Sequence, residues 1–375
     1  MKKILIDATG SSGWIGGVYH KKNILFSLLQ NEWISSNCSI VLVTNPEHVS
    51  VFKEFEDRVR IRTVSFKGVR EKKLKLAFIA FVNRCRYAFP NFDPRICRML
   101  HITCINWVPD YQHYHYPEFF SDEELESRKY VDRQTYDTGY PLVLSSEACL
   151  DDFRQFCSKN KENIYIVPFV SYIEKDVRSI TEEYLKTVCD RYGLIPGRYI
   201  MTANQFWQHK NHKVVLEALT RITDRCDPDL KLAFTGQLSD YRANEYIDLV
   251  KAMLADPKIK DRCVGTGFID RKEQLALMKG AAFLIQPSLF EGWGTVLEDA
   301  KVLDKTVLLS DIPVHREQMN DKCTLFDPHD AGGLGQLILE KWNCVEPDDS
   351  EAGIRRMYES ALSYSTGFER LLKEN

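Results

Sequence analysis

The sequence contains no apolar run that approaches the roughly 20 residues a helix needs to span a bilayer. Its 375 residues are 44% hydrophobic and 27% charged, which is typical of a soluble globular protein. Neither charge sign dominates, and a net charge of -3 gives no reason to expect a nucleic-acid partner. A signal peptide is not expected either, because Met1–Lys3 leads directly into the strand-like run Ile4–Asp7. We therefore expect a cytoplasmic protein.

Disulfide and metal-binding patterns are also missing. The eleven cysteines form no Cys-x-x-Cys pair, and their odd number and scattered positions argue against both a disulfide framework and a zinc site. No Asp-x-Asp pair occurs in a convincing metal-binding loop. We expect most cysteines to be reduced and buried, and we expect no bound metal.

The length of the chain predicts two domains, because a single hydrophobic core stops growing at about 250–300 residues. We expect an N-terminal domain at 1–175 and a C-terminal domain at 176–350. In the first half, strand-like runs alternate with helical stretches, which predicts a doubly wound α/β domain with ligands at the carboxyl ends of its strands. The expected strands are Lys3–Asp7, Ser39–Thr44, Arg60–Phe66, Leu142–Ser145 and Ile164–Val167, and the expected helices are Val18–Asn31 and Ser146–Lys159.

The most informative segment is Pro287–Lys301. It follows an apolar run, Ala281–Ile285, that predicts a buried parallel strand. Gly292 and Gly294 then form a tight turn that leads into the helical stretch Val296–Leu303. A helix that starts after such a turn presents free backbone N–H groups at the positive end of its dipole, and these groups bind phosphate.

Carboxylates surround this predicted phosphate site. Glu291 precedes the helix, and Glu298 and Asp299 lie within its first two turns. A phosphate group repels carboxylates, whereas a sugar diol donates hydrogen bonds to them. Phosphate-binding amides beside carboxylates therefore indicate a nucleotide-sugar site. The alternative is a glycine-capped surface helix whose acidic residues are solvated.

The same segment resembles the E-x7-E signature of retaining GT-B glycosyltransferases of family 4, the glycosyl transferases group 1. Glu291 matches the first Glu, whereas alignment on Ala300 puts Asp299 at the second position. Adjacent residues of a helix differ in direction by about 100°, so Glu298 and Asp299 cannot both face the ligand. The spacing favours Asp299 as the residue that holds the ribose, and Glu298 is the alternative.

The resemblance implies an α/β GT-B fold, in which two Rossmann-like doubly wound domains face a central cleft. It also implies that a C-terminal helix, 351–375, returns to the N-terminal domain. The implied activity is metal-independent transfer of a hexose, with retention, from a UDP- or GDP-sugar to an acceptor hydroxyl in surface polysaccharide or glycolipid biosynthesis. No cofactor besides this donor is implied.

A glycine-rich loop follows the first strand. Gly10, Gly13 and Gly16 imitate the loop of extended short-chain dehydrogenases and sugar epimerases. The chain has no Tyr-x-x-x-Lys pair, however, and no acidic residue in 33–46 to hold an adenosine ribose. The loop is better interpreted as that of an N-terminal GT-B domain, and the resemblance then places Gly16 and Gly17 against the donor diphosphate.

The segment Trp107–Ser121 resembles the Trp-Ile-Pro-Asp-Phe-Gln-His segment of one branch of these transferases. In that branch the histidine lies in the cleft near the donor sugar, which implies the same place for His113. Asp110, His113 and His115 are also residue types that ligate metals, but no further ligand follows at a matching spacing. We interpret His115 as a spectator.

A basic turn follows the strand-like run Arg198–Asn204. Related transferases often carry Arg-x-x-x-x-Lys-Gly at this turn, where both cations bind the diphosphate. Lys210 matches the lysine, whereas Gln205 stands at the arginine position and Asn211 at the glycine position. The chain thus has one cation fewer to stabilise the leaving nucleoside diphosphate. The alternative for Lys210 is an ordinary surface lysine.

The resemblance assigns catalytic roles to His113, Lys210 and Glu291. Gly265–Asp270 resembles the segment whose backbone contacts the nucleobase, and such contacts do not separate UDP from GDP. The expected donor-binding residues are Gly16, Gly17, Asn204, Lys210, Gly267, Phe268, Ile269, Glu291, Gly292, Trp293, Gly294, Thr295, Val296 and Asp299.

The stretch Lys67–His101 differs from the rest of the chain in charge. It contains nine Lys and Arg residues but only two acidic residues, Glu71 and Asp93. Apolar residues are interleaved among these charges. A basic amphipathic stretch can lie on an anionic membrane surface, which suits an enzyme with a lipid-linked acceptor at the inner face of a membrane. The alternative is a solvated basic face over an ordinary core helix.

The sequence therefore predicts a glycosyltransferase that acts on a glycan or lipid-linked acceptor. One alternative is a GT-B nucleotide-sugar epimerase or hydrolase, which needs no acceptor. The other is a catalytically weak donor-binding scaffold, for which the departures at Gln205 and Asp299 argue.

Overall fold

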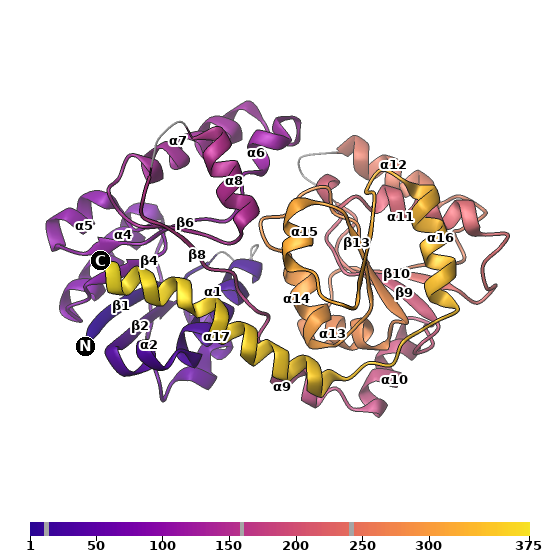
Figure 1. Cartoon of the computed structure of the whole chain (residues 1–375), viewed down its shortest axis with the longest axis horizontal. Helices are drawn as coiled ribbons and strands as arrows, with labels where there is room; N and C mark the ends of the chain where they lie inside the picture. Colours follow the sequence, from indigo (N-terminus) through magenta and orange to yellow (C-terminus); the bar gives the residue numbers. More distant parts are fainter. Residues whose placement is uncertain (11–14, 158–160, 240–243) are drawn as a thin grey trace. The chain divides into compact units, whose positions relative to one another are not determined.

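The computed structural model describes residues 1–10, 15–157, 161–239 and 244–375 (Figure 1). These residues form an α/β protein with parallel sheets, and they divide into two compact units. The predicted fold class, with two Rossmann-like doubly wound domains, is confirmed. The first unit comprises Met1–Tyr111, Asp122–Tyr172 and Tyr358–Asn375, and the second comprises Gln112–Ser121 and Ile173–Met357.

The first unit is built on a five-stranded parallel sheet of order β3-β2-β1-β4-β5. β1 (Lys2–Asp7) has a buried apolar centre, Ile4–Ile6, and β2 (Cys38–Thr44) is a nearly continuous apolar run, as expected for central strands of a parallel sheet. Their register pairs Ile4 with Ile40. The other strands are β3 (Arg60–Thr63), β4 (Tyr87–Phe89) and β5 (Thr103–Cys104).

A second parallel sheet of this unit has three strands in the order β6-β7-β8. The sequence predicts β7 (Leu142–Leu144) and β8 (Ile164–Ile166). It does not predict β6 (Asn106–Val108), β4 or β5, which have only two or three residues each.

Two helices, α4 (Val69–Val82) and α5 (Pro94–Leu100), pack on one face of the five-stranded sheet. Leu76 and Ala80 of α4 and Cys97 of α5 share a buried cluster with residues of β1, β2, β4 and β5. The predicted helix Ser146–Lys159 is observed as α8 (Glu147–Phe156), and residues 158 and 159 of the prediction lie outside the described part of the chain. The remaining helices of the unit are α1 (Ile15–Gln30), α2 (Glu32–Asn37), α3 (Val49–Phe52), α7 (Asp122–Tyr136) and α8 (Glu147–Phe156), with 3-10 turns η1 (Pro46–His48) and η2 (Lys53–Phe55).

The second unit is built on a six-stranded parallel sheet of order β11-β10-β9-β12-β13-β14. Within this sheet the first strand is β9, and the next two, β10 and β11, lie in turn towards one edge. β12 then pairs with the other side of β9, and β13 and β14 continue to the opposite edge. The order thus reverses between β9 and β12, and ligands of such sheets bind outside the carboxyl ends of the strands at this point. The strands are β9 (Tyr199–Thr202), β10 (Lys231–Phe234), β11 (Cys263–Gly265), β12 (Phe283–Gln286), β13 (Val307–Ser310) and β14 (Cys323–Phe326).

Helices α11 (His212–Ile222) and α16 (Ala331–Trp342) contribute to the core of this unit through residues such as Leu219 and Leu334. Asp270 and Asp330 cap α13 and α16 through their side chains, which fixes where these helices begin. The other helices are α6 (Gln112–His115), α9 (Glu174–Ser179), α10 (Glu182–Arg191), α12 (Asn244–Leu254), α13 (Arg271–Gly280), α14 (Thr295–Val302) and α15 (Pro313–Gln318), with 3-10 turns η3 (Pro117–Phe119) and η4 (Gln208–Lys210).

The last helix, α17 (Ser350–Glu374), belongs to both units: its first turns group with the second unit and the remainder with the first. Two glycines allow it to lie directly on neighbouring backbone. A Cβ atom at Gly353 would collide with the carbonyl of Val302, and one at Gly367 would collide with the carbonyl of Ile166. Any larger residue at either position would therefore push the helix away from its support.

Candidate functional site

The candidate site lies at the carboxyl ends of β9 and β12, which are neighbours where the sheet order reverses. Asn204 follows β9, and β12 ends at Gln286. The side-chain amide of Asn204 donates a hydrogen bond of 2.8 Å to Gln286 Oε1. Both residues are buried, so this amide pair forms a rigid base for the two loops that follow.

Lys210 and Glu291 come from these two loops. Lys210 Nζ lies 2.5 Å from Glu291 Oε1, and the two side chains are 15% and 10% exposed. The same oxygen accepts hydrogen bonds from Ser288 Oγ at 2.7 Å and from Gln286 Nε2 at 3.1 Å. No residue that the structure describes donates to Glu291 Oε2. That oxygen is therefore available to a ligand hydroxyl.

Glu291 is ionised at neutral pH. Burial by itself raises the pKa of its carboxyl, but the charge of Lys210 opposes this effect, and the resulting pKa is about 2. His315 also lies close to the carboxyl, yet burial lowers the pKa of His315 to about 4, so its ring is neutral at pH 7. Lys210 thus makes the largest contribution to keeping Glu291 charged.

Asn211 joins the two loops and explains one departure from the resembled pattern. Its side chain donates hydrogen bonds to the carbonyls of Pro287 at 3.1 Å and Pro328 at 2.9 Å. Its backbone is left-handed, with a φ of 53°. Asparagine adopts this conformation more readily than other residues with a side chain, and therefore replaces glycine here while adding two hydrogen bonds.

The turn before α14 is held by Gln318 of α15. Gly294 N donates to Gln318 Oε1 at 3.0 Å, and Gln318 Nε2 donates to Gly294 O at 2.8 Å. Thr295 and Val296 follow in the first turn of α14, where backbone N–H groups have no partner within a helix. The turn therefore presents the positive end of α14 in a fixed position. Gly292 lies within the same turn, and Trp293 beside it is buried.

Glu298 and Asp299 have different partners. Glu298 Oε1 accepts hydrogen bonds from Lys301 Nζ at 2.9 Å and from Gln318 Nε2 at 2.8 Å, and burial raises the pKa of this carboxyl. Asp299 pairs instead with Arg271 of α13, and its Oδ2 is buried without a hydrogen-bond partner. Glu298 thus supports the Gly294 turn through Gln318. Asp299 Oδ2, by contrast, can accept a hydrogen bond from a ligand. Asp299 is 0% exposed, so a ribose reaches it only if the residues that cover it shift.

The predicted nucleobase segment lies between β11 and α13. Gly267 has a left-handed backbone, with a φ of 70°, and its carbonyl accepts a hydrogen bond of 2.9 Å from Gly236 N. Phe268 is 65% exposed, which is unusual for so large an apolar ring. Ile269 is half-buried. Gln205, at the position of the expected arginine, accepts a hydrogen bond from Gln237 N at 3.2 Å and so supports the loop that follows β10.

His113 lies in α6, which groups with the second unit although the sequence predicts a place in the first domain. The helix packs against the loop that carries Glu291. The His115 ring lies 5.1 Å from that of Phe290, and Tyr116 Oη donates to Leu289 O at 3.4 Å. His113 itself is buried, with its ring 4.3 Å from that of Tyr114. His115, interpreted as a spectator, thus makes the ring contact to the site loop.

Gly16 and Gly17 lie in the first turn of α1, and Gly13 lies outside the described residues. Gly16 is exposed and Gly17 is buried. The first turn of a helix is a place from which backbone amides bind anions. Both glycines belong to the first unit, whereas Lys210, Glu291 and Asp299 belong to the second.

Sequence reasoning missed Gln286, Ser288, Arg271 and Gln318. Ser288 stands inside the resembled segment and could have been found there. The other three side chains reach the site because of the sheet order and the packing of α13 and α15, which no local pattern reveals.

The part of the chain that holds this site matches a known family. Residues 196–344, which include Lys210, Glu291 and Asp299, match the family described as Glycosyl transferases group 1. The second unit therefore contains a glycosyl transferases group 1 domain. No curated protein gives a significant match to the sequence.

Solved structures show the same fold over the whole chain. A glycosyltransferase from Rickettsia africae ESF-5 is 16% identical, with a TM-score of 0.66 and coverage of 100% of this chain and 96% of that chain. Anabaena Alr3699/HepE in complex with UDP-glucose is 14% identical, with a TM-score of 0.66 and coverage of 100% and 99%. Sucrose-phosphate synthase from Thermosynechococcus elongatus is 14% identical, with a TM-score of 0.65 and coverage of 100% of each chain. The chain thus has the fold of GT-B glycosyltransferases.

Proposed function

We propose that the protein is a retaining glycosyltransferase that moves a hexose from a UDP- or GDP-sugar to a hydroxyl of a glycan or lipid-linked acceptor. The observation that carries the proposal is the group formed by Lys210, Ser288 and Glu291 at the carboxyl ends of β9 and β12. It combines a cation for a diphosphate with a carboxylate for a sugar hydroxyl. The group 1 domain, and the likeness to HepE with bound UDP-glucose, support a nucleotide-sugar donor and favour UDP.

In the proposed reaction the bond between the sugar C1 and the phosphate oxygen breaks, and both electrons leave with the nucleoside diphosphate. Lys210 and the first-turn amides of α14 stabilise the charge that develops on that oxygen. The acceptor oxygen bonds to C1 on the same face of the sugar, and its proton passes to the departing phosphate. The configuration at C1 is therefore retained without a covalent sugar–enzyme intermediate.

The other residues orient the donor. Glu291 accepts a sugar hydroxyl at Oε2 and stays ionised because its pKa is about 2. His113 contacts the donor sugar from α6, while Asp299 accepts the ribose diol. Gly267 and Ile269 contact the nucleobase through their backbone, and the exposed ring of Phe268 offers it a stacking surface. The donor is the only small molecule required, and the reaction takes place in the cytoplasm as a step of surface polysaccharide or glycolipid synthesis.

Donor binding is tested by thermal denaturation in the presence of UDP- and GDP-sugars. A donor at a hundred times its Kd stabilises the folded protein by about 2.7 kcal/mol, which raises the Tm measurably. We expect one nucleotide series to raise the Tm and the other to leave it unchanged. If neither series changes the Tm at millimolar concentration, the proposed donor class is wrong.

Turnover is tested by product analysis with and without an acceptor. A transferase consumes the donor in proportion to the acceptor supplied and forms an α-linked product from an α-linked donor. Equal consumption of the donor without acceptor would identify an epimerase or hydrolase instead. Binding of the donor with no release of nucleoside diphosphate under any condition would identify a scaffold.

The role of Lys210 has a matched control in the same unit. Lys322 pairs with Asp304 at 2.6 Å and is 18% exposed, close to the 2.5 Å and 15% of Lys210 and its partner Glu291. Both Lys210→Ala and Lys322→Ala remove a lysine from a paired carboxylate, so both lower stability. We expect only Lys210→Ala to lower kcat sharply. Equal kcat values for the two variants would remove Lys210 from the mechanism.

A further inference from the structure

Helix α4 exposes an unusual amount of apolar surface. Fifteen large hydrophobic residues are exposed in the described part of the chain, and five of them lie on this helix of 14 residues. The five are Val69, Leu74, Phe78, Phe81 and Val82, which are between 53% and 70% exposed. Single exposed apolar residues are ordinary, but a gathering on one element marks an interaction surface.

Four of these residues form a stripe along the helix. At about 100° per residue, Leu74, Phe78, Phe81 and Val82 fall within an arc of about 100°. The opposite side of α4 is apolar too, and there Leu76 and Ala80 pack into the core of the unit. The core therefore accounts for one apolar face of the helix and leaves the other without a partner within this unit.

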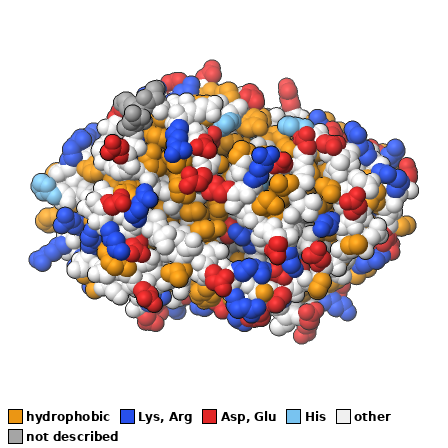
Figure 2. Space-filling model, in the orientation of Figure 1, with side chains coloured by type: hydrophobic (Ala, Val, Ile, Leu, Met, Phe, Trp, Pro, Cys, Tyr) orange, Lys and Arg blue, Asp and Glu red, His pale blue; other side chains and the backbone are white. Residues whose placement is uncertain are grey.

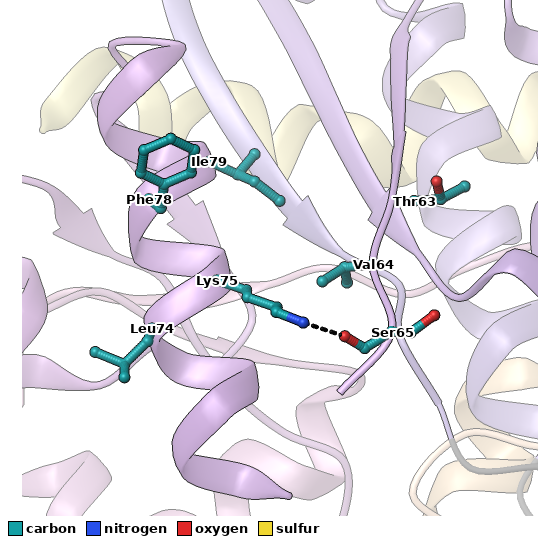
Figure 3. A pocket seen from close by; sticks show the side chains of 7 residues that line it. All are labelled: Thr63, Val64, Ser65, Leu74, Lys75, Phe78 and Ile79. Atoms are coloured by element: carbon teal, nitrogen blue, oxygen red, sulfur yellow. Dashed lines mark hydrogen bonds between the residues drawn. The ribbon is translucent and has the colours of Figure 1, made fainter. Parts of the chain in front are cut away.

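A hollow opens beside the stripe. It has a volume of about 430 Å³ and is lined by Leu74, Lys75, Phe78 and Ile79 of α4 and by the segment Thr63–Ser65, which begins at the last residue of β3. Figure 3 shows Leu74 directed away from this segment, whereas Lys75 reaches across to it and donates a hydrogen bond of 2.7 Å to Ser65 O. Lys75 also pairs with Glu71 at 2.6 Å, so its charge is already balanced and the hollow offers mainly apolar walls.

Positive charge surrounds the stripe. Lys67–His101 contains nine Lys and Arg residues and two carboxylates, a net charge of +7. Because the whole chain carries -3, the other residues carry -10. Figure 2 shows several Lys and Arg side chains at the left of the view, where Figure 1 places α4 and α5, among others spread over the rest of this face. The surface is therefore basic on a protein that is otherwise acidic.

Several of these cations have no counter-ion. Lys72 pairs with Asp7, and Lys73 and Arg95 share Asp93 at the start of α5. Five others are exposed and make no ion pair with any described residue: Lys67, Arg70, Arg84, Arg86 and Arg98. Cations left over in this way are available to an external anion.

The apolar stripe and the surrounding cations together indicate which kind of partner binds this surface. A second copy of the chain would place the same basic surface against itself, because a two-fold interface is self-complementary, and like charges would oppose each other. A nucleic acid would satisfy the cations and leave the aromatic stripe in water. A bilayer with anionic headgroups satisfies both, since apolar side chains enter the acyl boundary while Lys and Arg stay at the phosphates.

We propose that α4 and α5 dock the protein peripherally on a bilayer that contains anionic lipids, with Leu74, Phe78, Phe81 and Val82 inserted. None of the described helices has the length and apolarity to cross a membrane. Attachment in this mode is reversible and depends on salt. It rests on the surface of the first unit and does not depend on the activity proposed for the second.

Vesicle sedimentation tests the docking on the full chain. Vesicles of phosphatidylcholine alone are compared with vesicles that also contain phosphatidylglycerol, each at low and high salt. We expect sedimentation with the anionic vesicles at low salt, and at least tenfold weaker binding at high salt or without phosphatidylglycerol. Equal binding to both vesicle types, or binding to neither, would overturn the proposal.

Variants separate the contribution of the stripe from that of the cations. Phe78→Ser combined with Phe81→Ser should weaken binding to anionic vesicles at least tenfold. The control pair, Leu249→Ser with Leu362→Ser, changes exposed apolar residues elsewhere and should bind like the wild type. Because all four side chains are exposed, the Tm of each variant should stay close to the wild-type value. Wild-type binding by the Phe78 and Phe81 variant would contradict insertion.

A charge pair completes the test. Each Lys or Arg near an anionic surface contributes about 1 kcal/mol, so Arg84→Gln with Arg98→Gln should weaken binding roughly twenty- to thirtyfold. Arg221→Gln with Arg225→Gln removes the same charge from α11 and the residues after it, and should have little effect. Equal weakening by both pairs would mean that only total charge matters. A concentration-dependent dimer in sedimentation velocity that the Phe78 and Phe81 variant abolishes would identify a second copy as the partner, and would also overturn the proposal.

Discussion

Replacing Glu291 with glutamine tests the central carboxylate of the site, because the change keeps the shape of the side chain and removes its charge. In the wild type Oε1 accepts hydrogen bonds from Lys210, Ser288 and Gln286. A glutamine oxygen still accepts from these donors, but its second group is an NH2, which cannot accept a hydrogen bond from a sugar hydroxyl. The variant thus removes the function proposed for Oε2 with little change in packing.

The expected loss follows from the kind of bond that is removed. A hydrogen bond to a charged group contributes about 1.5–3 kcal/mol, so kcat/KM should fall about ten- to a hundredfold. Nucleotide affinity should change little, because Glu291 is proposed to contact the sugar and not the nucleotide. Glu291→Ala should show at least the same loss.

The same variant predicts a change in stability with pH. The pKa of Glu291 is lowered from 4.5 to about 2, a shift that corresponds to about 3 kcal/mol. For a lowered carboxyl pKa, this stability is fully present above the unfolded value and is lost as pH falls through the folded value. Between pH 5 and pH 2 the wild type should therefore lose about 3 kcal/mol more unfolding free energy than Glu291→Gln.

The assay combines steady-state kinetics, nucleotide titration and urea unfolding on one set of proteins. Asp304→Asn is the control, since Asp304 is a buried carboxylate of the same unit that pairs with Lys322 and Arg356. It should lose stability and keep kcat/KM per folded molecule. If Glu291→Gln keeps wild-type kcat/KM, the carboxylate does not contact the reacting sugar and the proposed site has the wrong orientation.

Further predictions concern the rest of the site. Asp299→Ala should weaken nucleotide binding about ten- to a hundredfold by titration, whereas Glu298→Ala should mainly lower the Tm because Glu298 supports the Gly294 turn; the reverse result would exchange their roles. Gly17→Val places a branched side chain in the first turn of α1 and should abolish transfer while donor binding partly survives, and His113→Ala should behave similarly; unchanged transfer would separate the glycine turn from the donor. EDTA should leave transfer intact, and strict dependence on an added divalent metal would contradict the proposed use of Lys210.

The sequence predicts the part of the site whose residues are close together along the chain. Pro287–Lys301 combines a strand, a glycine turn and a helix within 15 residues, and each has its own local pattern. The sheet class follows in the same way from the apolar runs of β1 and β2. β5 has two residues and no pattern to read.

The sequence does not predict the contacts that depend on which strands and helices lie side by side in the fold. The pairing of Asn204 with Gln286 requires β9 and β12 to be adjacent, although 82 residues separate the two side chains. The pairing of Arg271 with Asp299 requires α13 to lie beside α14. Likewise, α4 contains apolar residues around its whole circumference, so only the packed structure shows that Leu76 is buried and Phe78 is exposed.

The division of the chain makes the two proposals independent of each other. The docking residues Phe78 and Phe81 belong to the first unit, and Lys210 and Glu291 belong to the second. We therefore expect a change on α4 to leave the chemistry unchanged, and Lys210→Ala to leave vesicle binding unchanged. With a water-soluble acceptor, the Phe78→Ser and Phe81→Ser variant should keep its kcat. With an acceptor embedded in anionic vesicles, the same variant should lose transfer in proportion to its loss of binding. Loss of kcat with both acceptors would show that α4 acts on the reaction itself, and that attachment to the membrane is not its role.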